Sequence, residues 1–234
     1  MTDELWVCHL PQIEYREALE LQERVRAARQ ADRIPDTLLL LEHPPVYTRG
    51  RRSDPSELTM GEAWYRERGI DIVDTNRGGR VTYHGPGQLV GYPIMRIDDV
   101  IAYLRTMERA IVTALADAGI SARARPDEGP DFTGVWAGER KIASIGVHVS
   151  RGVTTHGFAI NVDNGLAPFR WVVPCGLTGV QMTSVLEEIG PAGDGDVPLL
   201  TSVREDMAAR FAEAFARRAV AVEADRVDAA APAA

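Results

Sequence analysis

In Arg80-Val-Thr-Tyr-His-Gly-Pro-Gly-Gln-Leu-Val-Gly-Tyr-Pro-Ile94, two strand-like runs, 80–83 and 89–94, flank the turn Gly85-Pro-Gly87. A helix is expected directly afterwards, capped by Asp98 and ending at Ala118, because its apolar residues recur at helical spacing. Strands followed at once by an amphipathic helix are typical of α/β chains. This stretch therefore predicts a sheet with helices packed on it.

The rest of the chain continues this alternation. Further strands are expected at 5–10, 37–41, 70–73, 135–137, 141–149, 153–162, 171–173 and 219–222, and further helices at 14–29, 61–68 and 201–218, the last capped by Thr201. We predict a single α/β (α+β) domain over residues 1–227, with a mixed β-sheet and packed helices. A flexible loop is expected at 190–198 and a disordered tail at 228–234.

Composition limits the classes of protein that fit. The chain has 234 residues, 45% of them hydrophobic and 26% charged, which is ordinary for a soluble globular protein. No apolar run is long enough to cross a membrane, and the acidic N-terminus does not resemble a signal peptide. Two cysteines give no disulfide framework, so we expect a cytoplasmic protein. The net charge of −8, without a basic face, argues against nucleic acid as a partner.

Cys175 is the first candidate for chemistry. It lies between Pro174 and Gly176 after the apolar run 171–173, a context that predicts an exposed thiol at the end of a strand. Cys8 lies inside an expected strand and is interpreted as a small core residue. An ordinary thiol is only a few per cent ionised near neutrality, so a reactive Cys175 needs a cation nearby.

Lys141 is the candidate cation. Of the 26 lysine and arginine residues it is the only lysine. Lysine can donate and accept a proton near neutral pH, which arginine cannot do. The alternative interpretation is that this single lysine remains by chance in a composition that has drifted towards arginine, and has no special role. As a pair, Lys141 would lower the pKa of Cys175 and then transfer its proton.

The segment Arg77-Gly-Gly-Arg-Val-Thr-Tyr-His-Gly-Pro-Gly-Gln88 is the densest motif. Its glycines would allow main-chain amides to face a ligand, and its turn would seat His84 and Gln88. It lacks the lysine of a phosphate-binding loop and is not a dinucleotide fingerprint. An ordinary glycine-rich hairpin is the alternative. His84 could be catalytic or positional.

Four motifs together resemble the lipoyl(octanoyl) transferase family over almost the whole chain. They are Arg77-Gly-Gly79 with Thr82-Tyr-His-Gly-Pro-Gly-Gln88, Lys141-Ile-Ala-Ser-Ile-Gly146, His156-Gly-Phe-Ala-Ile-Asn161 and Pro174-Cys-Gly176, and they occur in the order typical of that family. The resemblance implies the fold of lipoate- and biotin-protein ligase catalytic domains. It also implies transfer of an octanoyl group from acyl carrier protein to a lysine of lipoyl domains, in lipoate biosynthesis.

Site residues follow from the same resemblance. It implies that Cys175 is the acyl-thioester nucleophile and that Lys141 lowers its pKa. The implied acyl site consists of Arg77, Gly78, Gly79, Arg80, Val81, Thr82, Tyr83, His84, Ser144, Ile145, Gly146, Gly157, Phe158 and Ala159. No cofactor and no metal are expected. The expected partners are octanoyl-acyl carrier protein and the apo-lipoyl domains of 2-oxoacid dehydrogenase complexes and of the glycine-cleavage H protein, with the enzyme a monomer that binds no membrane.

Three other functions remain open from the residues alone. An ATP-dependent lipoate- or biotin-protein ligase would share the fold but needs no nucleophilic cysteine. An inactive acyl-binding protein and a cysteine hydrolase using Cys175 and His84 are the others. Separately, Arg49, Arg51 and Arg52 predict a basic rim that could receive an acidic carrier protein.

Overall fold

The computed structural model describes residues 3–172, 180–191 and 197–231, and its centre is a mixed sheet in the order β12-β1-β2-β6-β10-β9-β8-β7, with β11 beside β9. The strands of this sheet are β1 (Glu4–Gln12), β2 (Asp36–Glu42), β6 (Gln88–Ile94), β7 (Arg123–Ala124), β8 (Gly134–Ala137), β9 (Arg140–Ser150), β10 (Val153–Asn161), β11 (Gln181–Met182) and β12 (Arg218–Ala221). β1 pairs in parallel with β2 and β12. The remaining neighbours pair antiparallel: β2 with β6, β6 with β10, β10 with β9, and β9 with β8.

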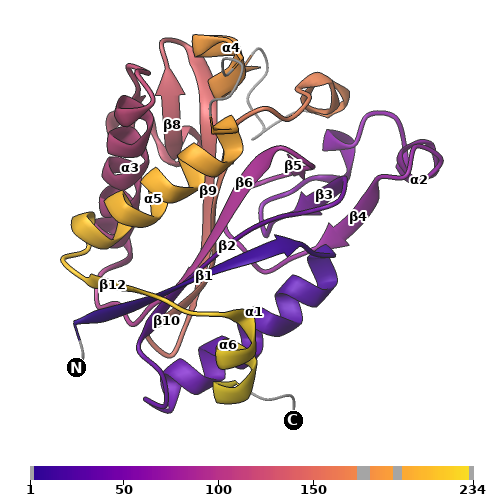
Figure 1. Cartoon of the computed structure of the whole chain (residues 1–234). Helices are drawn as coiled ribbons and strands as arrows, with labels where there is room; N and C mark the ends of the chain where they lie inside the picture. The colour runs from indigo at the N-terminus through magenta and orange to yellow at the C-terminus, as the bar shows by residue number, and fades with distance from the viewer. Residues whose placement is uncertain (1–2, 173–179, 192–196, 232–234) are drawn as a thin grey trace.

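Helices cover both faces of this sheet. α3 (Val100–Asp117) and α5 (Leu199–Ala214) pack side by side on one face, and α1 (Tyr15–Gln30) and α6 (Ala224–Ala230) lie on the other (Figure 1). The apolar run of β2 explains the two layers. Leu38 and Leu40 are buried in the cluster under α3 and α5, whereas Leu39 and Leu41 are buried in the cluster under α1. Side chains alternate between the faces of a strand, so one leucine run serves two cores.

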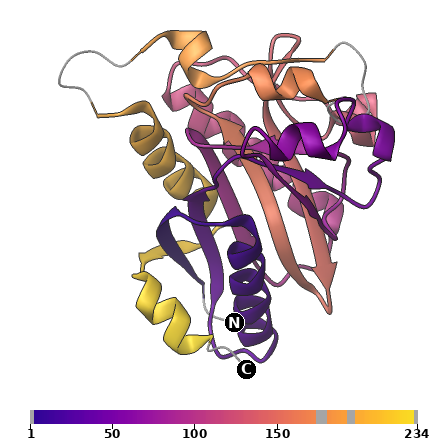
Figure 2. The same ribbon diagram turned by 90° about the vertical axis from the view of Figure 1, so that its right-hand side faces the viewer.

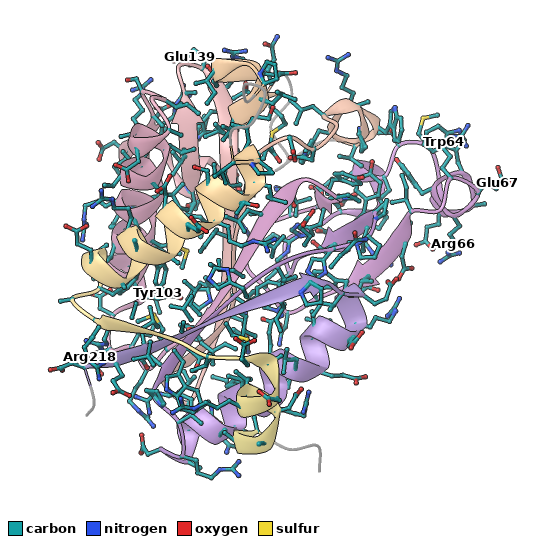
Figure 3. The ribbon with its side chains drawn as sticks, in the orientation of Figure 1. Trp64, Arg66, Glu67, Tyr103, Glu139 and Arg218 are labelled. Carbon is teal, nitrogen blue, oxygen red and sulfur yellow. The ribbon has the colours of Figure 1, made fainter. Side chains whose placement is uncertain are left out.

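A second, three-stranded sheet lies beside the large one, above α1 in both views (Figures 1 and 2). Its order is β4 (Asp71–Asp74), β3 (Val46–Arg49), β5 (Thr82–His84). The short helix α2 (Glu62–Arg66) lies at the outer edge of the molecule, where Figure 3 labels Trp64, Arg66 and Glu67. Short 3-10 turns occur at Pro55–Glu57, Pro126–Glu128, Pro130–Phe132 and Ala167–Trp171. The motif 77–88 contributes β5 to this small sheet and begins β6 of the large one, and the Gly78 amide bonds to Val147 O of β9.

The predicted fold class is confirmed, with differences at element ends. Asp99, not Asp98, caps α3, because its carboxylate accepts the amides of Ile101 and Ala102. α5 begins at Leu199 rather than at Thr201, and Leu199 packs against the core. Burial of apolar residues therefore extended the helix beyond its expected polar cap.

Two expected segments differ more. Residues 167–171 form a 3-10 turn instead of leading into a strand at 171–173, because Phe169 and Val172 are buried against the tyrosines of the small sheet. Residues 228–230 belong to α6 rather than to a disordered tail, and Ala231 is buried. Cys175, Gly176 and residues 192–196 lie outside the described residues. None of the described helices is long and apolar enough to cross a membrane.

Candidate active site

A cavity of about 320 Å³ lies where the 77–84 segment meets β9, β10 and α3. The predicted site residues converge on it from three separate parts of the sequence. Those that line it are Lys141, Arg77, Gly78, Gly79, Arg80, Val81, Thr82, His84, Ser144, Ile145, Gly146, Gly157, Phe158 and Ala159. Among the described candidates the exception is Tyr83, whose ring packs against Tyr47 and Phe169 on the far side of β5. Successive residues of a strand face opposite sides, so Tyr83 points away from its cavity-lining neighbours.

Lys141 is 2% exposed, although it lines the cavity. It lies on β9 directly opposite Trp136 of β8, and its Nζ is 5.4 Å from the centre of the Trp136 ring. Gly134 has a φ of 137°, and a β-carbon there would lie 2.4 Å from the carbonyl oxygen of Ala143 and 2.8 Å from Cε of Lys141, so this position requires glycine. Lysine is seldom this deeply buried, and here its ammonium group lies over an aromatic ring.

Arg77 and Arg80 anchor the glycine-rich segment 77–88 through hydrogen bonds to neighbouring residues. Arg77 Nη2 donates to the carbonyl and hydroxyl oxygens of Thr48 at 2.6 and 2.7 Å and to the carbonyl of Arg80 at 2.7 Å. Arg80 Nη1 donates to the buried carboxylate of Glu57 at 2.8 Å. The amide of Gly78 donates to Val147 O at 2.9 Å. The glycines were expected to allow main-chain amides to face a ligand, and the Gly78 amide does not, because it donates to β9.

Gly146 and Gly157 face each other across β9 and β10. A β-carbon on Gly157 would lie 2.2 Å from the carbonyl oxygen of Gly91, and one on Gly146 would lie 2.8 Å from that of Gly78. Real side chains do not approach so closely. The two glycines are needed because neighbouring main chains pass directly over them.

His84 is buried and uncharged near neutral pH. Burial, aided by the nearby His43 and Arg77, lowers the pKa of His84 well below its ordinary value. Its Nδ1 lies 2.7 Å from Gln88 Oε1, so Nδ1 carries the proton and donates it there. Its Nε2 is 3.5 Å from Thr48 Oγ1. Both ring nitrogens face partners within the protein, which favours the positional interpretation of His84.

Several cavity residues were not among the predicted site residues. His156 lies in a quoted motif, has a positive φ of 57°, and hydrogen-bonds through Nε2 to Asn76 Oδ1 at 2.7 Å. Burial lowers the pKa of His156 to about 3. The positive φ is unusual for histidine and is a signal of local strain that sequence alone does not reveal. Apolar wall residues were also missed: they are Val90, Val100, Leu104 and Val147.

Cys8 lies in the core. Cys8 is fully buried in the core under α1, and burial together with Glu223 raises the pKa of its thiol to about 11. The prediction that Cys8 is a core residue is confirmed. Cys175 lies outside the described residues, so its place at the site stays a prediction.

Acids neutralise part of the expected basic rim. Arg49 pairs with Asp74 and Glu62, both at 2.7 Å, and Arg52 pairs with Asp131 at 2.8 Å. Arg51 is exposed. Exposed ion pairs cancel much of the field that a partner would sense, so the rim is less basic than the sequence suggested.

Comparison with known proteins identifies the family. Residues 14–215 match the family described as lipoyl protein ligase A/B catalytic domain. An octanoyltransferase of Solibacter usitatus is 53% identical over 173 residues, which cover 72% of this chain and 77% of the relative. The chain belongs to the octanoyltransferase family. An octanoyltransferase of Acidobacterium capsulatum, 40% identical, is matched over 92% of both chains.

Solved structures agree on the fold. A bipartite lipoate protein ligase of Thermoplasma acidophilum superposes with a TM-score of 0.70 and 19% identity, covering 99% of this chain and 91% of that one. Lipoate-protein ligase A bound with ATP gives a TM-score of 0.69 at 19% identity, covering 99% and 93%. The fold expected from the sequence motifs is thus confirmed, and the protein is an acyltransferase of the octanoyltransferase type.

Proposed function

We propose that this protein transfers an octanoyl group from octanoyl-acyl carrier protein to a lysine of a lipoyl domain, through a thioester on Cys175. The observation that supports it best is the cavity itself. Its wall contains the nearly buried Lys141, and apolar side chains such as Leu104 and Phe158 supply surface for an acyl chain. Transfer of an apolar chain out of water into such a cavity is favourable by about 0.8 kcal/mol per CH₂ group.

The first half-reaction loads the enzyme. The Cys175 thiolate attacks the carbonyl carbon of the donor thioester, forming an S–C bond and placing negative charge on the carbonyl oxygen. Main-chain N–H groups of Gly176 and of the Lys141 strand are our candidates to stabilise that oxygen. The C–S bond to the carrier then breaks, and the departing thiolate takes a proton from the Lys141 ammonium.

The second half-reaction unloads it. The neutral amine of the acceptor lysine attacks the acyl-enzyme carbonyl carbon, and Lys141, now neutral, takes the proton that this nitrogen releases. The bond to Cys175 breaks, which regenerates the thiolate and the ammonium. An amide is more stable than a thioester, so the transfer needs no nucleotide. His84, being uncharged and bonded within the protein, orients the cavity wall in this scheme rather than moving a proton.

The acceptors we propose are the apo-lipoyl domains of 2-oxoacid dehydrogenase complexes and of the glycine-cleavage H protein. The donor carries a thioester made during fatty-acid synthesis, so we place the reaction in the cytoplasm. We further propose that the enzyme acts as a monomer. The Thermoplasma acidophilum ligase, which shares the fold, was studied with its own E2 lipoyl domain, a client of the same kind.

An intact-protein mass spectrum after incubation with octanoyl-acyl carrier protein tests the proposal. We expect one octanoyl adduct, mapped by peptide analysis to Cys175 and lost on adding apo-lipoyl domain. Cys8 is the internal control, because it is fully buried and its pKa is raised to about 11. An adduct on Cys8, or transfer without any adduct, contradicts the covalent mechanism. Strict dependence on ATP with free octanoate as donor would support the ligase alternative.

A further inference from the structure

A continuous series of hydrogen bonds joins the glycine-rich motif to Lys141. His84 Nδ1 donates to Gln88 Oε1 at 2.7 Å, and Gln88 Nε2 donates to Asn161 Oδ1 at 2.9 Å. Asn161 Nδ2 then donates to the carbonyl oxygen of Thr183 at 3.0 Å. Finally, the amide of Thr183 donates to the carbonyl oxygen of Lys141 at 3.0 Å.

Asn161 is the central member of this series. Its side chain is 2% exposed, and it accepts on one side and donates on the other. A carboxylate of the same size could accept from Gln88 but could not donate to Thr183 O. An apolar side chain could do neither and would leave Gln88 Nε2 and Thr183 O with one partner fewer.

The position of Asn161 gives this series its importance for the site. It lies at the end of β10, two residues after the cavity residue Ala159. Thr183 follows the two-residue strand β11, in which Met182 pairs with Lys141. A two-residue strand is weakly held by its own ladder, so the Asn161 side chain supplies a separate attachment between β10, β11 and the Lys141 main chain.

We propose that Asn161 is a positioning residue for Lys141: it fixes the Lys141 main chain relative to the cavity wall. This inference rests on the proposed role of Lys141 in octanoyl transfer. Reacting groups must be held closely, and a misplacement of about 1 Å can cost about 100-fold in rate. Loss of the Asn161 contacts therefore lowers kcat and weakens the effect of Lys141 on the Cys175 thiol, while donor binding in the cavity is largely retained.

The test compares Asn161→Leu with Thr154→Val. Thr154 is on the same strand and is also buried, and like Asn161 it does not line the cavity. Its hydroxyl accepts from Met95 N at 2.9 Å and donates to Pro93 O at 2.7 Å. Both changes remove buried hydrogen bonds of β10, so both lower the urea midpoint. Only Asn161→Leu touches the series that leads to Lys141.

Two measurements separate positioning from stability in the folded enzymes. One is kcat and KM with a small octanoyl thioester, and the other is the pH midpoint of Cys175 alkylation by iodoacetamide. We expect kcat of Asn161→Leu to fall by about 10- to 100-fold, with a similar KM and an alkylation midpoint shifted upward. We expect Thr154→Val to keep the wild-type kcat and midpoint.

Equal kcat and equal alkylation midpoints in the two variants would overturn the inference. If Asn161→Leu does not fold, Asn161→Asp replaces it, since it matches asparagine in size and keeps the acceptor for Gln88, but an ionised carboxylate cannot donate to Thr183 O and repels it. It is assayed over a series of pH values up to about 9, because burial raises a carboxyl pKa and a protonated carboxyl could still donate. A wild-type enzyme that forms no Cys175 adduct refutes the proposed function instead, which keeps the two failures distinguishable.

Discussion

Replacing Lys141 by arginine separates the charge of this residue from its proton transfer. Arginine keeps the positive charge, so it can still favour the Cys175 thiolate and allow some acyl-enzyme to form. It does not lose its proton near neutral pH, so it cannot act first as acid and then as base. Loss of general acid–base catalysis typically costs about 10²- to 10⁴-fold in rate. We expect the loss chiefly at the step in which the acceptor amine attacks.

The structure adds a packing cost to this substitution. Lys141 is 2% exposed, and the β-carbon position of Gly134 lies 2.8 Å from its Cε. The larger guanidinium has to fit between the Trp136 ring and the cavity. Overfilling a packed site typically costs about 1–3 kcal/mol, and about 2–4 °C of Tm is lost per kcal/mol in a protein of this size. We therefore expect Lys141→Arg to fold, with Tm lower by roughly 2–12 °C.

The assay is single-turnover transfer followed in two stages, acyl-enzyme formation and release to the lipoyl domain, with thermal unfolding measured in parallel. Arg140→Lys is the control, because Arg140 is the preceding residue of β9 and forms a partly exposed ion pair with Glu188 at 2.8 Å. It should change neither rate nor Tm appreciably. Turnover of Lys141→Arg within a few-fold of wild type would refute the proton-transfer role, and an unchanged Tm would refute the packing estimate.

Three further predictions concern the cavity wall, the buried histidines and the arginine rim. Gly157→Ala should lower the free energy of unfolding by about 1–3 kcal/mol, because the added β-carbon would lie 2.2 Å from Gly91 O. Gly165→Ala is the control: no atom lies near its β-carbon position, so the free energy of unfolding should change by less than about 0.5 kcal/mol. Urea titrations measure both. Burial lowers the pKa of His156 to about 3 and that of His43 to about 4, so the unfolded chain binds protons more readily than the folded protein. The free energy of unfolding should therefore fall as pH drops from about 6.5 towards 4. A urea midpoint that stays constant over this range would contradict this prediction. Salt should raise KM for octanoyl-acyl carrier protein more than for a small octanoyl thioester, and Arg51→Ala should reduce that difference; equal salt sensitivity would exclude the rim as a docking surface.

Local pattern was sufficient for most of the architecture. The run Leu38–Leu41 predicted a buried strand, and its alternate residues enter the two cores. The apolar spacing in 14–29 predicted α1 to within one residue at each end. These features depend on the period of the side chains along the backbone, which sequence displays directly.

The candidate site was predictable as a set of motifs but not as an arrangement. Sequence order placed Arg77, Lys141 and Gly157 far apart, and only the pairing of β9 with β10 and the packing of the small sheet brought them to one cavity. Nothing in the sequence indicated that the Gly78 amide donates to Val147 O. That contact depends on which strand lies opposite, and the opposite strand is far away in the sequence.

The sequence by itself therefore determined most of the element types, the buried leucine run, the burial of Cys8, and the family through its motif order. Tertiary structure alone decided the start of α5, the 3-10 turn at Ala167–Trp171, the neutralised arginines and the Asn161 contact to Thr183. The physical reason is the range of the interactions. Periodicity and turn chemistry act within a few residues, whereas burial, charge pairing and polar satisfaction depend on neighbours that folding brings from distant parts of the chain.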